Sequence, residues 1–174
     1  VPAGQTLLGI NVAMRDPGQT SGGAIAGEGT AVITNTSISA GLPFSLSVVY
    51  TAGATGIQPG GKVGMTVPPG FPFPLDSIFS SSITARSGAA LSAVNYSGPS
   101  VFVTLASALL PGATVGFEWS NVFAPCAVGA ATFTVTSVSD GTGAPAPLFG
   151  GSPSVPVVAG SAVFFQLSSA YFSV

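Results

Sequence analysis

The fold class follows from residues 101–120, which have the sequence VFVTLASALLPGATVGFEWS. Large apolar residues occupy every second position on either side of a central turn: Val101, Val103, Leu105, Val115 and Phe117. Such alternation is typical of β-strands that bury one face. Between the two runs lies Leu110-Pro111-Gly112, in which proline presets φ and glycine tolerates a positive φ. The stretch therefore predicts two strands joined by a tight turn.

The same pattern recurs along most of the chain, with turn-forming residues at intervals of about 10 to 15 residues, as in a sandwich or barrel. The predicted strands lie near 6–14, 30–37, 43–51, 61–68, 79–86, 90–95, 100–106, 113–120, 130–138, 154–158 and 162–172. No long window carries the apolar stripe of a helix, and the 24 Gly and 15 Pro residues would interrupt one. We therefore expect an all-β fold, a single Ig-like or jelly-roll sandwich of about 9–11 strands with an N-terminal extension strand.

Alternation within these strands also predicts which side chains form the core. The candidates are Val48, Met65, Val67, Phe71, Val101, Val103, Leu105, Val115, Phe117, Phe133 and Val135. A sugar-binding site would use Trp119 as a stacking platform and Glu118 as an acceptor. The favoured interpretation is a buried Trp119 beside a Glu118 that lies on the rim or pairs with a cation.

Charged residues are scarce in this sequence. The 174 residues include three Lys or Arg, five Asp or Glu and no His, while 47% are hydrophobic and the mean hydropathy is +0.66. An ordinary soluble domain is about one quarter charged and relies on this charge to stay apart from its copies. No run of about 18 apolar residues is present to span a bilayer as a helix. The composition therefore favours a protein that packs against copies of itself and has no membrane span.

The composition also argues against several functional classes. Nucleic-acid binding needs clustered basic residues, whereas Arg15, Lys62 and Arg86 are scattered and the net charge is −2. The absence of His and the dispersed carboxylates leave no general base, paired acid/base site or metal site. Cys126 has no second cysteine to pair with and no neighbouring base, so we expect a buried, inert thiol. We expect no enzymatic activity, cofactor or metal.

The two ends of the chain carry the most apolar candidate strands. On one face of the predicted strand 6–14 lie Leu8, Ile10, Val12 and Met14. The Gly-rich residues that follow form a candidate hinge, so we divide the chain into an N-terminal segment, 1–29, and a sandwich body, 30–174. The strand can complete the open sheet of a neighbouring subunit, as a donor strand, or pair within its own sandwich. The C-terminal strand 162–172 is expected to be central in a sheet or covered by a neighbour, because no charged residue follows Asp140.

Residues 31–139 contain a series of motifs in a characteristic order. They are SAGLPFSLSVVY at 39–50, IQPGGKVGMTVPPGF at 57–71, LLPGATV at 109–115, NVFAP at 121–125 and GAATFTV at 129–135. In this order they resemble the Ig-like β-sandwich domains of prokaryotic cell-surface proteins. The resemblance implies the fold and a location at the cell surface, but it implies no activity. Such domains occur in tandem, whereas here one unit carries extra strands at both ends.

The size, the β content and the apolar N-terminal strand together resemble the secreted subunits of archaeal bundling pili and threads and of TasA-type biofilm-matrix fibres. The resemblance implies a structural subunit of an extracellular filament. Such a filament is a homopolymer assembled head to tail by donor-strand complementation, and its filaments can bundle laterally. The alternatives are a monomeric cell-surface adhesin or binding domain and a jelly-roll coat protein.

Two further features fit an extracellular protein. The chain begins Val1-Pro2 without Met, as expected of a secreted chain whose signal peptide has been removed. Asn35 and Asn95 each begin an N-x-Ser sequence and are candidate N-glycosylation sites. Glycans at these positions would supply hydration that charged residues do not.

Overall fold

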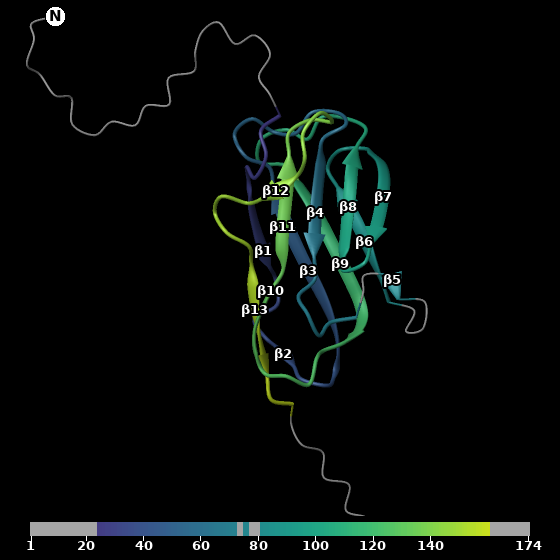
Figure 1. Ribbon diagram of the computed structural model, residues 1–174, viewed down its shortest axis with the longest axis vertical. Helices are drawn as coiled ribbons and strands as arrows, with labels where there is room; N and C mark the ends of the chain where they lie inside the picture. Colours follow the sequence, from purple (N-terminus) through teal and green to yellow (C-terminus); the bar gives the residue numbers. More distant parts are fainter. Residues whose placement is uncertain (1–23, 73–74, 77–80, 161–174) are drawn as a thin grey trace, which may run out of the picture.

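A computed structural model describes residues 24–72, 75–76 and 81–160 (Figure 1). Within these residues the chain forms thirteen strands and no helix, which confirms the all-β prediction. The strands are β1 (Thr30–Ile33), β2 (Ile38–Ser39), β3 (Pro43–Thr51), β4 (Lys62–Thr66), β5 (Leu75–Asp76), β6 (Ser81–Ser87), β7 (Leu91–Ser97), β8 (Ser100–Leu105), β9 (Thr114–Phe123), β10 (Gly129–Thr132), β11 (Thr134–Val138), β12 (Ala146–Pro147) and β13 (Ser154–Val158).

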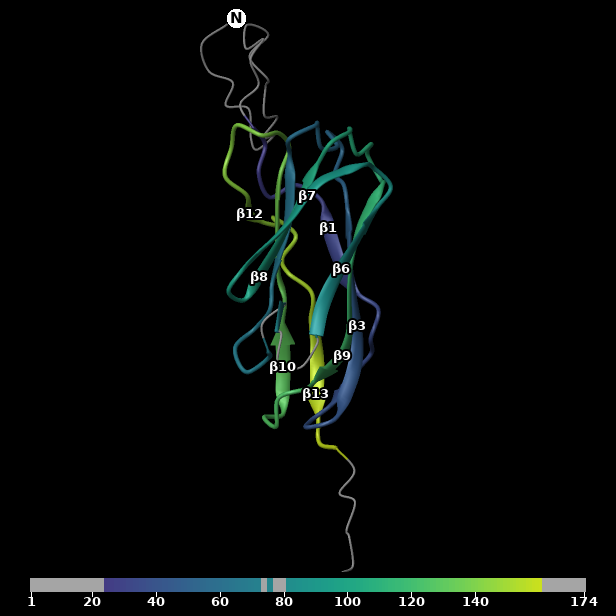
Figure 2. The same ribbon diagram turned by 90° about the vertical axis from the view of Figure 1, so that its right-hand side faces the viewer.

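The strands form the two layers of a sandwich, seen edge-on in Figure 2. One layer is a five-stranded sheet with the order β1-β3-β9-β6-β5, and the other is a five-stranded sheet with the order β12-β11-β4-β8-β7. A three-stranded sheet with the order β10-β13-β2 continues the second layer at the bottom of Figure 1. We refer to the end with β2 as the lower end and to the end with the β3–β4 and β8–β9 loops as the upper end.

Alternating side chains of the two layers form a single core. Every predicted core residue is buried, including Val103 and Phe117, which have no exposed surface. Trp119 is also fully buried, and the Nε atom of Arg86 lies 2.9 Å from Oε2 of Glu118. The predicted pairing of Glu118 with a cation is therefore confirmed, and a buried Trp119 offers no stacking platform for a sugar.

Most predicted strands are present, and β3 and β13 have the predicted bounds. The predicted strand 130–138 is wrong in one respect, because it is two strands, β10 and β11. Phe133 separates them: its N–H donates to the carbonyl of Pro153 at 2.9 Å, whereas Thr134 pairs with Thr66 of β4. The chain thus passes from one sheet to the next at Phe133. The sequence predicts none of β2, β5 and β12, since two residues are too few to show alternation.

The described chain begins at the upper end and leaves at the lower end, after β13 (Figure 1). Residues 24–28, which belong to the candidate hinge, are hydrogen-bonded to the sandwich. The N–H of Ile25 donates to Oγ of Ser139 at 2.7 Å, and the N–H of Gly27 donates to the carbonyl of Ser137 at 3.0 Å. The predicted strands 6–14 and 162–172 lie outside the described residues.

Candidate assembly surfaces

The described charged side chains lie at the upper end or at mid-height. They are Glu28, Lys62, Arg86, Glu118 and Asp140, while the side chain of Asp76 on β5 is not described. Several are engaged locally: Arg86 pairs with Glu118, and Oδ1 of Asp140 accepts hydrogen bonds from the backbone N–H and hydroxyl of Thr142 at 2.8 and 2.7 Å. These bonds hold the pKa of Asp140 below its usual value. The described part of the lower end therefore carries no charge.

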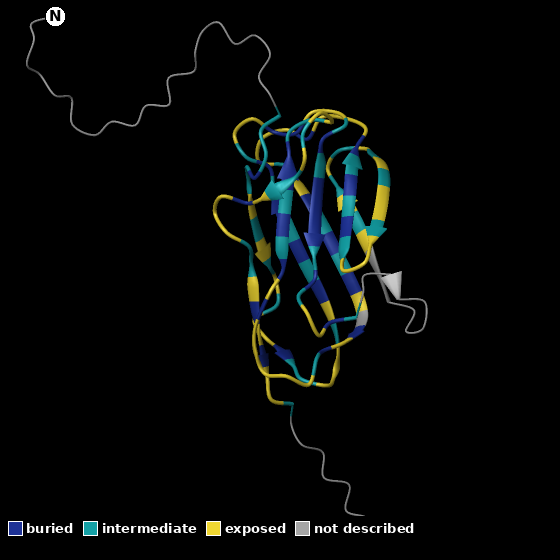
Figure 3. Ribbon diagram, viewed as in Figure 1, coloured by how far each residue is buried: buried dark blue, intermediate teal, exposed yellow. Residues whose placement is uncertain are grey.

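The lower end exposes large apolar side chains instead. Leu42, Phe123, Val128 and Val158 are 45%, 52%, 63% and 42% exposed, and they are half of the exposed large hydrophobic residues in the described part of the chain. We call this surface the apolar end. Hydrogen bonds connect the segments that carry these residues: the N–H of Ala124 donates to the carbonyl of Leu42, the N–H of Ala40 donates to the carbonyl of Val158, and Gly129 of β10 pairs with Val157 of β13. Figure 3 shows the exposed loops that form this surface. The apolar end is therefore a candidate interaction surface.

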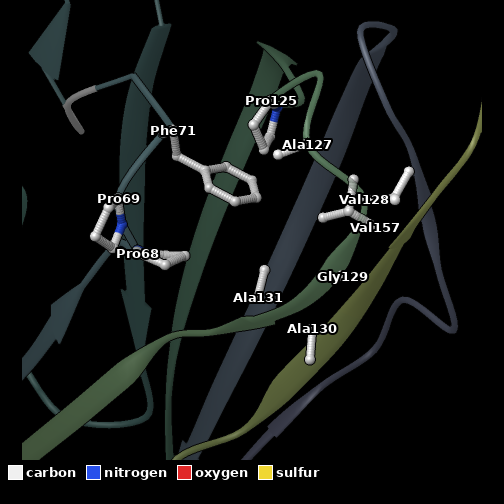
Figure 4. Close-up of a pocket in the computed structure, with 11 residues that line it drawn as sticks. Pro68, Pro69, Phe71, Pro125, Ala127, Val128, Gly129, Ala130, Ala131 and Val157 are labelled. Atoms are coloured by element: carbon white, nitrogen blue, oxygen red, sulfur yellow. The ribbon is translucent and has the colours of Figure 1, made fainter.

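A groove of about 240 Å³ lies beside β10 at the lower end (Figure 4). Its lining is formed by apolar residues and glycine: Pro68, Pro69, Gly70, Phe71, Pro125, Ala127, Val128, Gly129, Ala130, Ala131 and Val157. The Pro68–Phe71 turn forms one side, and β10 with β13 forms the other. We call this feature the β10 groove. Without a charged or polar side chain in its lining, it suits an apolar segment and offers no catalytic group.

Aromatic side chains support the floor of the β10 groove. Phe71 is 7% exposed, and its ring packs edge-on against Phe133 with centroids 5.4 Å apart. Phe44 packs edge-on against Phe71 at 6.0 Å and against Trp119 at 6.4 Å. Nε1 of Trp119 is buried and has no hydrogen-bond partner among the described residues. These edge-on contacts connect the floor of the groove to the aromatic part of the core.

The predicted site residues fall into two groups. The polymerisation strand with Leu8, Ile10, Val12 and Met14 lies outside the described residues. Both candidate glycosylation sites are described. The side-chain amide of Asn35 donates to the carbonyl of Ser45 at 2.9 Å, and this bond competes with glycan attachment. Asn95 is exposed on β7, so of the two it is the more accessible to a glycan.

Cys126 corrects one prediction. The thiol is exposed rather than buried. It lies in the β9–β10 loop at the apolar end, where an exposed position replaces the expected core position because the loop projects beyond both sheets. Within the described residues, His, Cys, Asp and Glu form no cluster that would hold a metal ion, and no helix is long and apolar enough to cross a membrane.

No family model matches the chain, and no curated protein matches it. Among solved structures it is similar to BslA, which is described as a bacterial hydrophobin, with a TM-score of 0.52 and 21% identity over 79% of this chain and 99% of BslA. The sixth cohesin of scaffoldin B from Acetivibrio cellulolyticus aligns with a TM-score of 0.43 and 12% identity over 75% of this chain and 99% of the cohesin. The likeness to BslA confirms the β-sandwich fold. The resemblance to pili and TasA-type fibres stays a prediction.

Proposed function

We propose that this protein is a structural subunit of an extracellular filament, a homopolymer in which residues 6–14 of one copy complete the sheet of the next. The role is structural and needs no catalytic step or cofactor. The observation that carries the proposal is the placement of an uncharged, apolar, grooved surface at one end of the sandwich and of the attachment point of residues 1–23 at the other.

This placement favours insertion into a neighbour over insertion at home. The nine-residue strand β3 indicates a sandwich at least about 30 Å long. Residues 15–23 reach at most about 30 Å when fully extended. To lie antiparallel to its own β10, the segment would first have to run nearly straight along the whole molecule to the lower end. A neighbour stacked on the upper end presents its lower end directly to the segment. Such a head-to-tail contact does not close on itself, so it produces an open filament.

The scarcity of charge supports the same proposal. A free monomer would present the apolar end to water without charges to oppose self-association. In a filament, the apolar end of each subunit is covered by the next subunit. The proposal also places the protein outside the cell, in keeping with its composition, its sandwich fold and the resemblance to cell-surface domains.

The test compares two acidic substitutions on opposite faces of the predicted strand in the full chain. Ile10→Asp places a carboxylate on the apolar face, where insertion would bury it without a partner. Asn11→Asp places the same charge on the other face. We expect Ile10→Asp to remain monomeric and Asn11→Asp to form filaments, as judged by light scattering and negative-stain microscopy. Normal filaments from Ile10→Asp would refute the proposal.

A second candidate function is adsorption to an interface through the apolar end. It is favoured by the exposure of Phe123 and Val128 and by the fold shared with BslA, a bacterial hydrophobin. Phe123→Ser should then slow the fall in surface tension at an air–water interface, whereas Phe149→Ser, at an exposed position between β12 and β13, should not. If Ile10→Asp leaves adsorption intact while Phe123→Ser reduces it, the second function is favoured over the filament.

A further inference from the structure

We propose that the acceptor site for residues 6–14 of a neighbouring copy is the free edge of β10, with the inserted strand lying in the β10 groove. This inference rests on the proposed function and adds the site, the backbone groups and the face of the strand that it uses. β10 is the outer strand of the sheet β10-β13-β2, and no other strand pairs with its far edge in the described part of the chain.

The backbone groups that face the groove can be derived from the register. In the antiparallel pair, Ala130 lies opposite Pro156. Proline has no N–H, so these two residues cannot exchange a pair of hydrogen bonds. The N–H of Phe133 donates to the carbonyl of Pro153, which continues the same register. Alternate residues bond to β13, so Gly129, Ala131 and Phe133 face β13 and the residues between them do not. The N–H and C=O groups of Ala130 and Thr132 therefore point away from β13 and into the groove, where an inserted strand can bond to them.

The slot exists because the neighbouring strands stop at mid-height. β4 ends at Thr66 and β8 begins at Ser100, where the two strands pair with each other. After β4 the N–H of Val67 donates to the carbonyl of Pro99, the next residues, Pro68 and Pro69, supply no N–H, and Gly70 has φ of +90°. The chain therefore turns aside instead of continuing as a strand beside β10. Among the described residues, no strand pairs with β10 on the side opposite β13, and Figure 4 shows the Pro68–Phe71 turn across the groove from β10.

The lining of this slot matches one face of the predicted donor strand. In β10 the side chain of Ala131 is buried, while Ala130 and Thr132 are exposed. A donor residue opposite Ala131 points inward with it, toward Phe71 and Val157. With four residues, β10 has room beside it for about two inward donor side chains, and the rest of the apolar face extends past its ends. The groove has no charged lining residue that could pair with a buried charge, so the inward face of the donor strand has to be apolar.

Disulfide cross-linking in the full chain tests the site. In a Cys126→Ser background, Thr132→Cys is combined in turn with Gly9→Cys, Asn11→Cys and Ala13→Cys, which lie on the outward face of the predicted donor strand. Hydrogen-bonded partners in an antiparallel pair have Cα atoms about 5.5 Å apart, within the range of a disulfide. The control is Val32→Cys with the same three partners, because β1 is also the outer strand of a sheet and Val32 is 57% exposed.

We expect at least one Thr132→Cys combination to give a ladder of disulfide-linked oligomers on a non-reducing denaturing gel, and no Val32→Cys combination to do so. A ladder with Val32→Cys alone would overturn the β10 site and leave donor-strand assembly standing. A fast-migrating, internally linked monomer with Thr132→Cys would show that the strand inserts at home and overturn both. A cross-link between Thr132→Cys and Ser168→Cys would show that the C-terminal segment fills the groove and overturn the site. Absence of every cross-link in chains that still form filaments would also overturn it.

A backbone substitution gives a second measurement. Ala130→Pro removes the N–H that faces the groove but no bond to β13, whereas Ala130→Ser keeps that N–H. One lost hydrogen bond should raise the protein concentration needed for filament assembly about two- to tenfold relative to Ala130→Ser. Circular dichroism and the unfolding midpoint establish that both variants fold. Equal assembly of two folded variants would overturn the site without affecting the Ile10→Asp test of the proposed function.

Discussion

Replacement of Phe133 by Ala should be among the most destabilising single changes in this sandwich. The side chain has no exposed surface, and its ring packs edge-on against Phe71 at 5.4 Å. Deletion of a buried Phe costs about 3–5 kcal/mol, the sum of lost transfer energy and the cavity left behind. Of this, the contact with Phe71 contributes about 0.5–1.5 kcal/mol. For a chain of this size the melting temperature should fall by about 6–20 °C.

The measurement is urea unfolding monitored by tryptophan fluorescence. Trp119 is the only Trp in the sequence, and it lies in the same aromatic cluster. Phe149→Ala is the matched control, since the same atoms are removed from a side chain that is 81% exposed. It should change the free energy of unfolding by less than about 0.5 kcal/mol. A loss below about 0.5 kcal/mol for Phe133→Ala as well would show that Phe133 lies outside the core and refute the assignment of β10 and β11 to one continuous core.

Three further changes test other parts of the fold. Tyr50→Phe removes the hydroxyl that donates to the carbonyl of Glu28 at 2.9 Å, so it should cost about 0.5–1.5 kcal/mol in urea unfolding. Burial raises the pKa of Tyr50 above 10.0, so the native protein should lose stability as the pH rises above 10.0, and Tyr50→Phe should lack this loss. The pKa of Asp140 is lowered in the folded state, so its contribution to folding stability is present at neutral pH. This contribution disappears as the pH falls below 3.8 through the folded-state pKa, and Asp140→Asn should remove that acid dependence. Gly56→Ala should destabilise more than Gly112→Ala in thermal melts: both have positive φ, but a Cβ at Gly56 would lie 2.5 Å from the carbonyl of Leu109, whereas at Gly112 it would meet nothing within 4 Å.

The parts of the fold that the sequence predicts are those governed by local alternation. In β8, Val101, Val103 and Leu105 are buried and the residues between them are partly exposed, as the pattern indicates. Period-two alternation is strong there because the strand lies between a core and solvent. The same reasoning predicts that Glu118, beside a buried Trp119, lies on the rim or pairs with a cation, whereas the identity of the partner, Arg86, comes from the structure.

Structural features that depend on segments far apart in the sequence cannot be predicted from the alternation of apolar and polar residues. The alternation in residues 130–138 continues without interruption through Phe133, but the partner strand changes there from β13 to β4. The tertiary fold determines which strands pair. A segment that leaves one sheet and enters another therefore has the sequence pattern of a single strand. The prediction of a buried Cys126 is wrong for a related reason: residue type favours burial, but the residue lies in the β9–β10 loop and is exposed.

The β10 groove shows the same limit for a candidate site. Its sides come from the Pro68–Phe71 turn, the β9–β10 loop and Val157, which are far apart in sequence. The one local clue is Pro156 within the strand 154–158, because a proline in a strand identifies a position whose N–H is not needed. That clue becomes informative only when the register places Pro156 opposite Ala130 and so reveals the direction of the free edge.

In the proposed filament, the arrangement of the two ends would also explain how the chain tolerates its low charge. If apolar surface were spread evenly, the scarcity of charge would lead to association in many orientations. Here half of the exposed large apolar residues in the described part of the chain lie at the lower end, next to the β10 groove, and the described charged side chains lie elsewhere. Backbone pairing along β10, as we propose, would be directional and would require a strand in one register, so it would select one contact among the many that hydrophobicity alone would allow. In the proposed filament, a surface with little charge would therefore be compatible with ordered growth, because the contact that gives the filament its direction would also cover the apolar end.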